Sequence, residues 1–183
     1  MMRFEISPVI AAVRSAEEYA AALESGAETV FVVKSDLLSL REMLAEKRGK
    51  QVFVHADTCE GLGKDKVGLE VLSRLGADGV ISTKNSLIAA AKGLGLGTVQ
   101  RFFLIDSLSV QTAFESVSAS RPDCAELMPG VLCKEIARFR ARTQPFNVKI
   151  IAGGLIESKS DVIAALSAGA DAVSVGRQEL WYI

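Results

Sequence analysis

The chain has 183 residues, of which 49% are hydrophobic, so it is long enough for one domain with a large core. Lys and Arg number 21 and Asp and Glu 22, and this balance argues against a strongly basic domain that binds polyanions. No uncharged stretch has the length of a membrane span, and the first five residues do not resemble a secretory signal. Three widely spaced cysteines fit neither a disulfide framework nor a zinc site. We therefore expect a cytoplasmic protein with reduced thiols, no metal and no cofactor.

Short apolar runs alternate with amphipathic stretches along the whole chain, which predicts alternating strands and helices. The expected strands cover residues 8–13, 29–33, 51–55, 79–82, 98–105, 124–128, 148–152 and 171–175. The expected helices cover residues 16–25, 36–48, 65–75, 85–94, 107–118, 131–142 and 158–168, and the chain ends in a segment at 178–183. Ser15 lies three residues before Glu18, which is a capping-box pattern at the start of the first helix.

A weak internal repeat supports this count of elements. Gly26-Ala27-Glu28, Gly76-Ala77-Asp78 and Gly169-Ala170-Asp171 are similar junctions, each followed by a β-rich run. We expect each glycine to end a helix in the left-handed conformation, where a side chain is costly. The distance along the chain from Gly26 to Gly76 fits two βα units, and the distance from Gly76 to Gly169 fits four.

Eight βα units with nearly continuous apolar strands predict a parallel sheet covered by helices. The expected fold is a single compact (β/α)₈ TIM-type barrel over residues 1–183, with short loops because such barrels typically have about 250 residues. An open doubly wound sheet is the alternative. Its dinucleotide-binding form is weakened because no Gly-x-Gly-x-x-Gly follows the first strand.

Glycines follow the two last expected strands, at Ala152-Gly153-Gly154-Leu155 and Ser174-Val175-Gly176-Arg177. The corresponding loops of such barrels often bind phosphate, since glycine lets backbone N–H groups approach an anion. We therefore predict a phosphate site at Gly153, Gly154, Gly176 and Arg177. The alternative is that these glycines only form tight turns.

Further polar residues stand at the carboxyl ends of the other strands, where the site of this fold lies. The predicted ligand-binding residues are Arg14, His55, Asp57, Lys84, Arg101 and Glu126. His55 is the only histidine, and with Asp57 it fits a ligand contact, a base with its orienting carboxylate, a divalent-metal pair or a simple hydrogen-bonded pair. Arg101 lies inside an apolar strand and needs a partner, for which Glu126 is the natural candidate. Lys84 suits an anion contact, a Schiff base or a solvated helix turn.

One cationic stripe is the candidate RNA-binding surface. Lys134, Arg138 and Arg142 recur every four residues along the sixth expected helix. Such stripes are more often solvated faces, and charge alone does not predict RNA binding here.

The order of motifs resembles the glycerol-3-phosphate-responsive antiterminator family over essentially the whole chain. The motifs that carry the resemblance are Pro8-Val9-Ile10-Ala11-Ala12-Val13-Arg14, Val54-His55-Ala56-Asp57, Gly79-Val80-Ile81-Ser82-Thr83-Lys84, Gln100-Arg101-Phe102-Phe103-Leu104-Ile105-Asp106-Ser107, Glu126-Leu127-Met128-Pro129-Gly130, Ala152-Gly153-Gly154-Leu155-Ile156 and Glu179-Leu180-Trp181. The resemblance implies a regulator of glycerol metabolism without catalysis. Its regulatory ligand would be glycerol 3-phosphate, and it would act on leader mRNA of a glycerol operon as a transcription antiterminator.

Two hypotheses of different class follow. The first is a ligand-responsive, RNA-binding regulator, for which we expect no contact with a membrane and for which a homo-oligomer is one option. The second is a small phosphosugar isomerase, epimerase or aldolase, with Lys84 or Asp57 as its base. Binding of glycerol 3-phosphate without turnover separates the first from the second.

Overall fold

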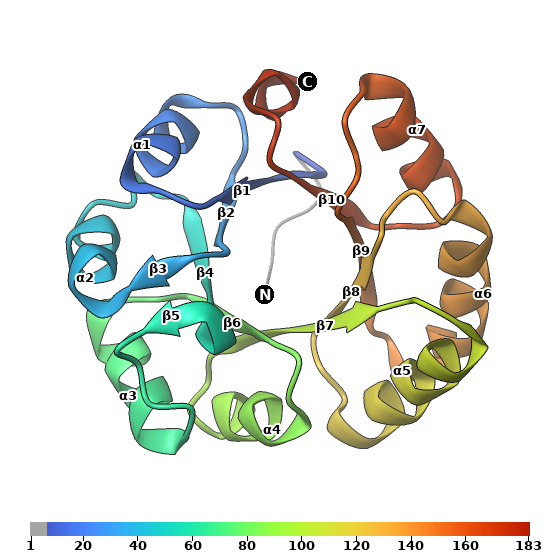
Figure 1. Ribbon diagram of the computed structural model, residues 1–183, viewed down its shortest axis with the longest axis horizontal. Helices are drawn as coiled ribbons and strands as arrows, with labels where there is room; N and C mark the ends of the chain where they lie inside the picture. Colours follow the sequence, from blue (N-terminus) through green and yellow to red (C-terminus); the bar gives the residue numbers. More distant parts are fainter. Residues whose placement is uncertain (1–6) are drawn as a thin grey trace.

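A computed structural model describes residues 7–183, and its central feature is a closed barrel of eight parallel strands (Figure 1). Around the barrel the strands run in the order β1, β10, β9, β8, β7, β6, β4 and β2. Their bounds are β1 Val9–Val13, β2 Thr29–Val32, β4 Gln51–His55, β6 Gly79–Ser82, β7 Gly97–Phe103, β8 Cys124–Met128, β9 Lys149–Gly153 and β10 Ala172–Val175. The predicted TIM-type barrel is confirmed, and the open sheet is excluded because β1 pairs with both β2 and β10.

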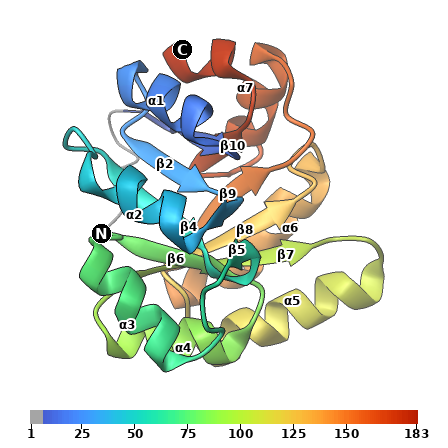
Figure 2. The ribbon, with the colours of Figure 1, turned by 60° about the vertical axis from the view of Figure 1, so that its left-hand side comes forward.

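Seven α-helices surround the barrel, and Figure 2 shows α1 to α4 following one another around its outside. Their bounds are α1 Ala16–Glu24, α2 Leu37–Ala45, α3 Lys66–Leu75, α4 Asn85–Gly93, α5 Ser107–Ser120, α6 Cys133–Thr143 and α7 Lys159–Ser167. Serine or aspartate side chains cap most of their N-termini by accepting backbone N–H groups. These caps are Ser15, Asp36, Asp65, Asp106 and Ser158. At Ser15 the predicted capping box is changed, because Glu18 accepts the N–H of Arg14 rather than that of Ser15.

No eighth α-helix closes the ring within residues 7–183. A 3₁₀ helix, η3 at Gln178–Tyr182, fills the gap between α7 and α1 (Figure 1). Trp181 is buried there, and its indole N–H donates to the carbonyl of Val175 at 2.8 Å. The C-terminal segment therefore contributes to the core although it is short.

The barrel interior is filled by inward-facing apolar side chains, including Ile10, Phe31, Phe53, Ile81 and Val99. Two glycines make this packing possible beside Phe53. A Cβ at Gly79 would lie 2.3 Å from the Phe53 ring, and one at Gly97 would lie 2.9 Å from it. A large aromatic ring on one strand is thus accommodated by missing side chains on the next two.

Several predicted boundaries are wrong. The second helix ends at Ala45, and the fifth strand ends at Phe103, which leaves Leu104 and Ile105 in the loop. The sixth helix begins at Cys133 because the chain first makes a turn at residues 129–132. The sequence also did not predict a small parallel pair beside the barrel, formed by β3 (Ser35–Asp36) and β5 (Cys59–Glu60).

The repeated glycine junctions are confirmed in two places and wrong in one. Gly76 and Gly169 end their helices with φ of 94° and 106°. Gly26 is not left-handed, because α1 ends at Ser25, whose hydroxyl donates to Ala22 and accepts the N–H of Ala27. The side chain of Ser25 replaces the glycine turn there.

The acidic residues of these junctions secure the amino ends of the strands. Asp78 accepts the N–H of Val52 at 2.8 Å, and Asp171 accepts that of Ile150 at 2.6 Å. Asp123, which precedes β8, accepts the N–H of Thr98 at 2.8 Å in the same way. Each carboxylate therefore ties the start of one strand to the start of its neighbour. None of the described helices meets the length and hydropathy of a membrane-spanning segment.

Candidate functional site

A cavity of about 560 Å³ opens at the carboxyl ends of the strands. This volume is within the range of small-molecule sites, about 300–1,000 Å³. Among the predicted site residues, those that line it are Arg14, His55, Arg101, Glu126, Gly154, Gly176 and Arg177. The barrel thus brings together residues that are far apart in the sequence, and their ligand binding stays a prediction.

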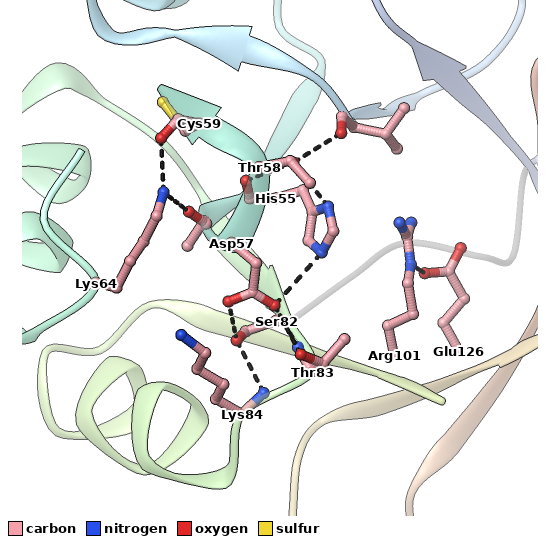
Figure 3. Close-up of polar contacts among 12 residues, drawn as sticks. His55, Asp57, Thr58, Cys59, Lys64, Ser82, Thr83, Lys84, Arg101 and Glu126 are labelled. Carbon is pink, nitrogen blue, oxygen red and sulfur yellow. Dashed lines mark hydrogen bonds and ion pairs between the residues drawn. The ribbon is translucent and has the colours of Figure 1, made fainter. Parts of the chain in front are cut away.

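The floor of the cavity is a buried polar network from three strands. Arg101 Nε donates to Glu126 Oε2 at 2.7 Å, which confirms the predicted pair, and Ser174 Oγ donates to Glu126 Oε1 at 2.6 Å. Glu126 is fully buried and Arg101 is 8% exposed. Only Nε of Arg101 contacts Glu126 (Figure 3), and its two terminal nitrogens donate to no acceptor in residues 7–183. They remain available to a ligand.

The rim of the cavity carries two further arginines. Arg14 is exposed, and its guanidinium nitrogens lie 3.5 Å from the place where a Cβ of Gly176 would be. Arg177 is 58% exposed, and its nearest acid is Glu157 at 3.7 Å, which is a weak contact. The rim is therefore richer in unpaired positive charge than the floor.

The loops after β9 and β10 present free backbone donors. The N–H groups of Leu155, Ile156 and Arg177 donate to no described acceptor. Gly154 has φ of 75° and Leu155 has φ of 58°, so this turn is left-handed at two successive residues. Unpaired N–H groups in a turn are a feature of concave anion sites. Phosphate binding at these loops stays a prediction.

Gly153 has a different role from Gly154 and Gly176, the other glycines of the predicted phosphate site. It does not line the cavity, and a Cβ there would lie 2.5 Å from Ser174 Oγ and 2.6 Å from Glu126 Oε1. Its carbonyl accepts the N–H of Gly130, which joins the β9 loop to the turn before α6. Gly153 thus leaves room for the floor network.

His55 and Asp57 belong to a second network beside the cavity (Figure 3). His55 Nδ1 is 2.8 Å from Thr58 Oγ1, and its Nε2 is 3.6 Å from Asp57 Oδ2. Asp57 accepts hydrogen bonds from Ser82 Oγ at 2.9 Å and from the N–H of Thr83 at 2.7 Å. Burial alone would raise the pKa of Asp57, but these donors and His55 outweigh it and hold the pKa well below its usual range. Asp57 is therefore an ionised carboxylate, and at 3.6 Å it leaves the buried Nε2 of His55 without a hydrogen-bond partner among residues 7–183.

Besides Gly153, two further predicted residues are not brought to the cavity. Asp57 is separated from it by His55, and Lys84 is exposed at the N-cap of α4, where its backbone N–H donates to Ser82 Oγ at 3.0 Å. The basic side chain that stabilises this region is Lys64, which donates to the carbonyls of Ala56 and Cys59 and so holds the 3₁₀ turn η1 (Ala56–Thr58). The sequence offered no pattern for Lys64, because it lies in a loop.

The cationic stripe lies on the outer face of α6. Lys134 is exposed, Arg138 pairs with both carboxylate oxygens of Glu135 at 3.0 Å, and Arg142 lies over the ring of Phe114 at 3.6 Å. The structure therefore gives two of the three cations partners within the protein. RNA binding by this face stays a prediction.

Sequence reasoning missed nine residues that line the cavity: Ala12, Val33, Thr58, Phe103, Met128, Leu155, Ile156, Glu157 and Ser174. The alternation of strand residues gave a signal for Ser174, since Ala172 in the same strand faces the barrel interior. No such sequence signal pointed to Thr58, because this residue lies in a turn after the strand.

Metal chemistry and thiol chemistry have little support. Within residues 7–183 no three His, Cys, Asp or Glu side chains are grouped as metal ligands. Cys59 and Cys124 are buried, and burial raises the pKa of the Cys124 thiol far above its usual range. Cys124 is therefore a core residue with little thiolate character.

These features define a compact (β/α)₈ barrel with a cationic cavity at its mouth. The model of the family described as "Glycerol-3-phosphate responsive antiterminator" matches residues 9–181. The chain belongs to this family, which confirms the resemblance seen in its motifs.

Solved structures and a curated relative agree with this membership. A glycerol uptake operon antiterminator regulatory protein from Listeria monocytogenes is 30% identical with a TM-score of 0.90, over 98% of this chain and 97% of its own. A glycerol uptake operon antiterminator-related protein from Thermotoga maritima is 31% identical with a TM-score of 0.83, over 94% of this chain and 96% of its own. The uncharacterized protein YgcP of Escherichia coli is 32% identical over 96% of this chain and 92% of its own. Membership supports a regulatory, non-enzymatic role in glycerol metabolism.

Proposed function

We propose that this chain senses glycerol 3-phosphate in the mouth cavity and controls transcription antitermination by binding leader mRNA of a glycerol operon. One observation carries the proposal. Three arginines, Arg14, Arg101 and Arg177, converge on the same cavity as the free N–H groups of the β9 and β10 loops. Such a set of donors suits a phosphate ester, because guanidinium and backbone N–H groups both bind phosphate oxygens.

The charge distribution of the cavity favours one orientation of the bound ligand. The phosphate lies at the rim, against Gly154, Gly176 and Arg177, because positive charge is least compensated there. The glycerol hydroxyls point to the floor, where the terminal nitrogens of Arg101 donate to their oxygens. Buried hydroxyls require such partners, so the floor makes the site selective for a polyol.

RNA binding is assigned to the α6 face with Lys134, Arg138 and Arg142. The turn before α6 is hydrogen-bonded to the phosphate loop, since Gly130 donates to Gly153 and Gly154. The ligand then raises the population of the conformer that binds RNA, in proportion to its preference for that conformer. A role on nascent mRNA implies a cytoplasmic location.

The alternative of a phosphosugar enzyme depended on Lys84 or Asp57 as its base, and neither side chain lines the cavity. Lys84 is exposed outside the cavity, and Asp57 is engaged by Ser82 and Thr83. A Schiff-base lysine or a carboxylate base must reach the reacting carbon of a bound ligand. Neither group lies where a ligand of this cavity would place that carbon.

Calorimetric titration tests the ligand, with glycerol and inorganic phosphate as controls. We expect binding of glycerol 3-phosphate, much weaker binding of both fragments and no turnover. A single-round transcription assay on a leader template then measures read-through with and without the ligand. Consumption of a sugar phosphate, or binding of inorganic phosphate as tight as that of the ester, contradicts the proposal.

A further inference from the structure

Arg101 is a cation whose charge is already cancelled at the floor. Its Nε donates to Glu126 Oε2 at 2.7 Å, and Glu126 is fully buried. Ser174 occupies the other carboxylate oxygen at 2.6 Å, so the carboxylate has a protein donor on each oxygen. The floor therefore presents N–H donors without net positive charge.

The surroundings of the floor add no positive charge to it. Asp57, which lies behind His55, is held ionised by Ser82 and Thr83. The nearest cations without a strong acidic partner are Arg14 and Arg177, and both are at the rim. The cavity thus has a cationic rim and a floor that is polar but uncharged.

We infer that Glu126 is a specificity-determining residue, which makes the floor accept the uncharged end of a phosphorylated polyol and exclude phosphorylated hydroxy acids. This inference rests on the proposed function, because it assumes that the phosphate lies at the rim. Glu126 acts through Arg101: it leaves the arginine as a hydrogen-bond donor to hydroxyl oxygens and removes its attraction for a carboxylate.

The physical reason is the cost of a second carboxylate beside a buried one. A hydroxyl oxygen accepts an N–H of Arg101 with no change of charge in the floor. A ligand carboxylate in the same place would add a second negative charge next to Glu126, in surroundings of low dielectric where like charges repel strongly. It would also lose its hydration without gaining a free counter-ion.

The chosen test is the substitution Glu126→Gln, which keeps the shape of the side chain and removes its charge. Titration calorimetry compares glycerol 3-phosphate with 3-phosphoglycerate, in which a carboxylate replaces the terminal CH₂OH. We expect the wild-type chain to prefer glycerol 3-phosphate at least a hundredfold. In the variant the preference falls at least tenfold, because Arg101 becomes an uncompensated cation that pairs with the carboxylate.

Glu115→Gln is the matched control, since Glu115 is exposed on α5 and its one polar contact within the described residues 7–183 is with Gln111. It should leave the preference unchanged. If Glu126→Gln also keeps the wild-type preference, the inference is overturned while the proposed function stands. If the wild-type chain binds neither compound, the proposed function fails first.

A second variant covers the case in which Glu126→Gln does not fold. Arg101→Met with Glu126→Leu removes both charges, and replacing a buried ion pair by apolar residues is often tolerated. With an uncharged floor this variant should bind both compounds more weakly and still prefer glycerol 3-phosphate. Equal or tighter binding of 3-phosphoglycerate by the double variant would refute the inference.

Discussion

The two ends of the barrel differ in whether their charged and polar groups have hydrogen-bond partners within the protein. At the amino end, the carboxylates of Asp78, Asp123 and Asp171 each accept a backbone N–H of a neighbouring strand. Asp78 and Asp171 also pair with Lys47 and Arg140. At the mouth, by contrast, the terminal nitrogens of Arg101 and the N–H groups of Leu155, Ile156 and Arg177 have no partner within residues 7–183.

This difference separates stability from binding. A polar group that is satisfied by the protein contributes to folding, and removing its partner leaves an unpaired group at a cost. A polar group that is left open contributes little to folding and is free to hold a ligand. Substitutions at the amino end should therefore change the free energy of unfolding, and those at the rim should change affinity.

The largest effect is expected for Asp171→Ala at the amino end. The change removes the acceptor for Ile150 N–H and the partner of Arg140. Hydrogen bonds to charged groups contribute about 1.5–3 kcal/mol each, so we expect a loss of about 3 kcal/mol in the free energy of unfolding. Urea denaturation measures it, and glycerol 3-phosphate affinity of the folded fraction should stay unchanged. A stable variant with weakened ligand binding would break the distinction between the ends.

Arg177→Ala should show the opposite behaviour at the rim. Arg177 is 58% exposed with one weak acidic contact, so its removal should change the unfolding free energy by less than about 0.5 kcal/mol. Loss of a charge-assisted bond to phosphate weakens binding by about 1.5–3 kcal/mol, or roughly 10- to 150-fold. Calorimetry at constant ionic strength is the measurement. Unchanged affinity would remove Arg177 from the site.

The barrel was predictable from sequence because its signals repeat. The eight apolar runs each mark a βα unit and favoured a closed barrel, while the open sheet was excluded only by the pairing of β1 with β2 and β10. The junction at Gly26 shows the limit of such a pattern, since the hydroxyl of Ser25 ends the helix without a left-handed glycine. A local side-chain hydrogen bond of this kind leaves no trace in the spacing of residues.

The buried pair at the floor was predictable because both of its residues belong to strands, although other strand residues of the cavity were missed, namely Ala12, Phe103, Met128 and Ser174. Arg101 and Glu126 stand on adjacent strands in register, and a buried arginine requires an acid, so their pairing followed from the sequence. The positions of Thr58 and Lys84 depend on how the chain turns after a strand. Residue propensities do not determine the direction of such a turn. Thr58 was therefore missed, and Lys84 was wrongly expected in the cavity.

A smaller, pH-dependent effect is expected from Asp57 beside the mouth. Its donors hold its pKa below the value in the unfolded chain, which is about 3.9. A lowered folded-state pKa stabilises the protein above that pH, and the contribution is lost as pH falls below it. The free energy of unfolding of the wild-type chain should therefore decline below about pH 4 more steeply than that of Asp57→Asn. Parallel acid titrations of the two proteins would contradict this assignment.

The smallest effect is expected for Lys84→Ala, and it tests the boundary of the mouth site. Lys84 is exposed, it does not line the cavity, and only its backbone N–H has a role in the described network. Alanine preserves that N–H, so both the unfolding free energy and the affinity for glycerol 3-phosphate should stay within about 0.5 kcal/mol of the wild type. A tenfold loss of affinity would show that the loop after β6 closes over the ligand, and the mouth site would then extend to α4.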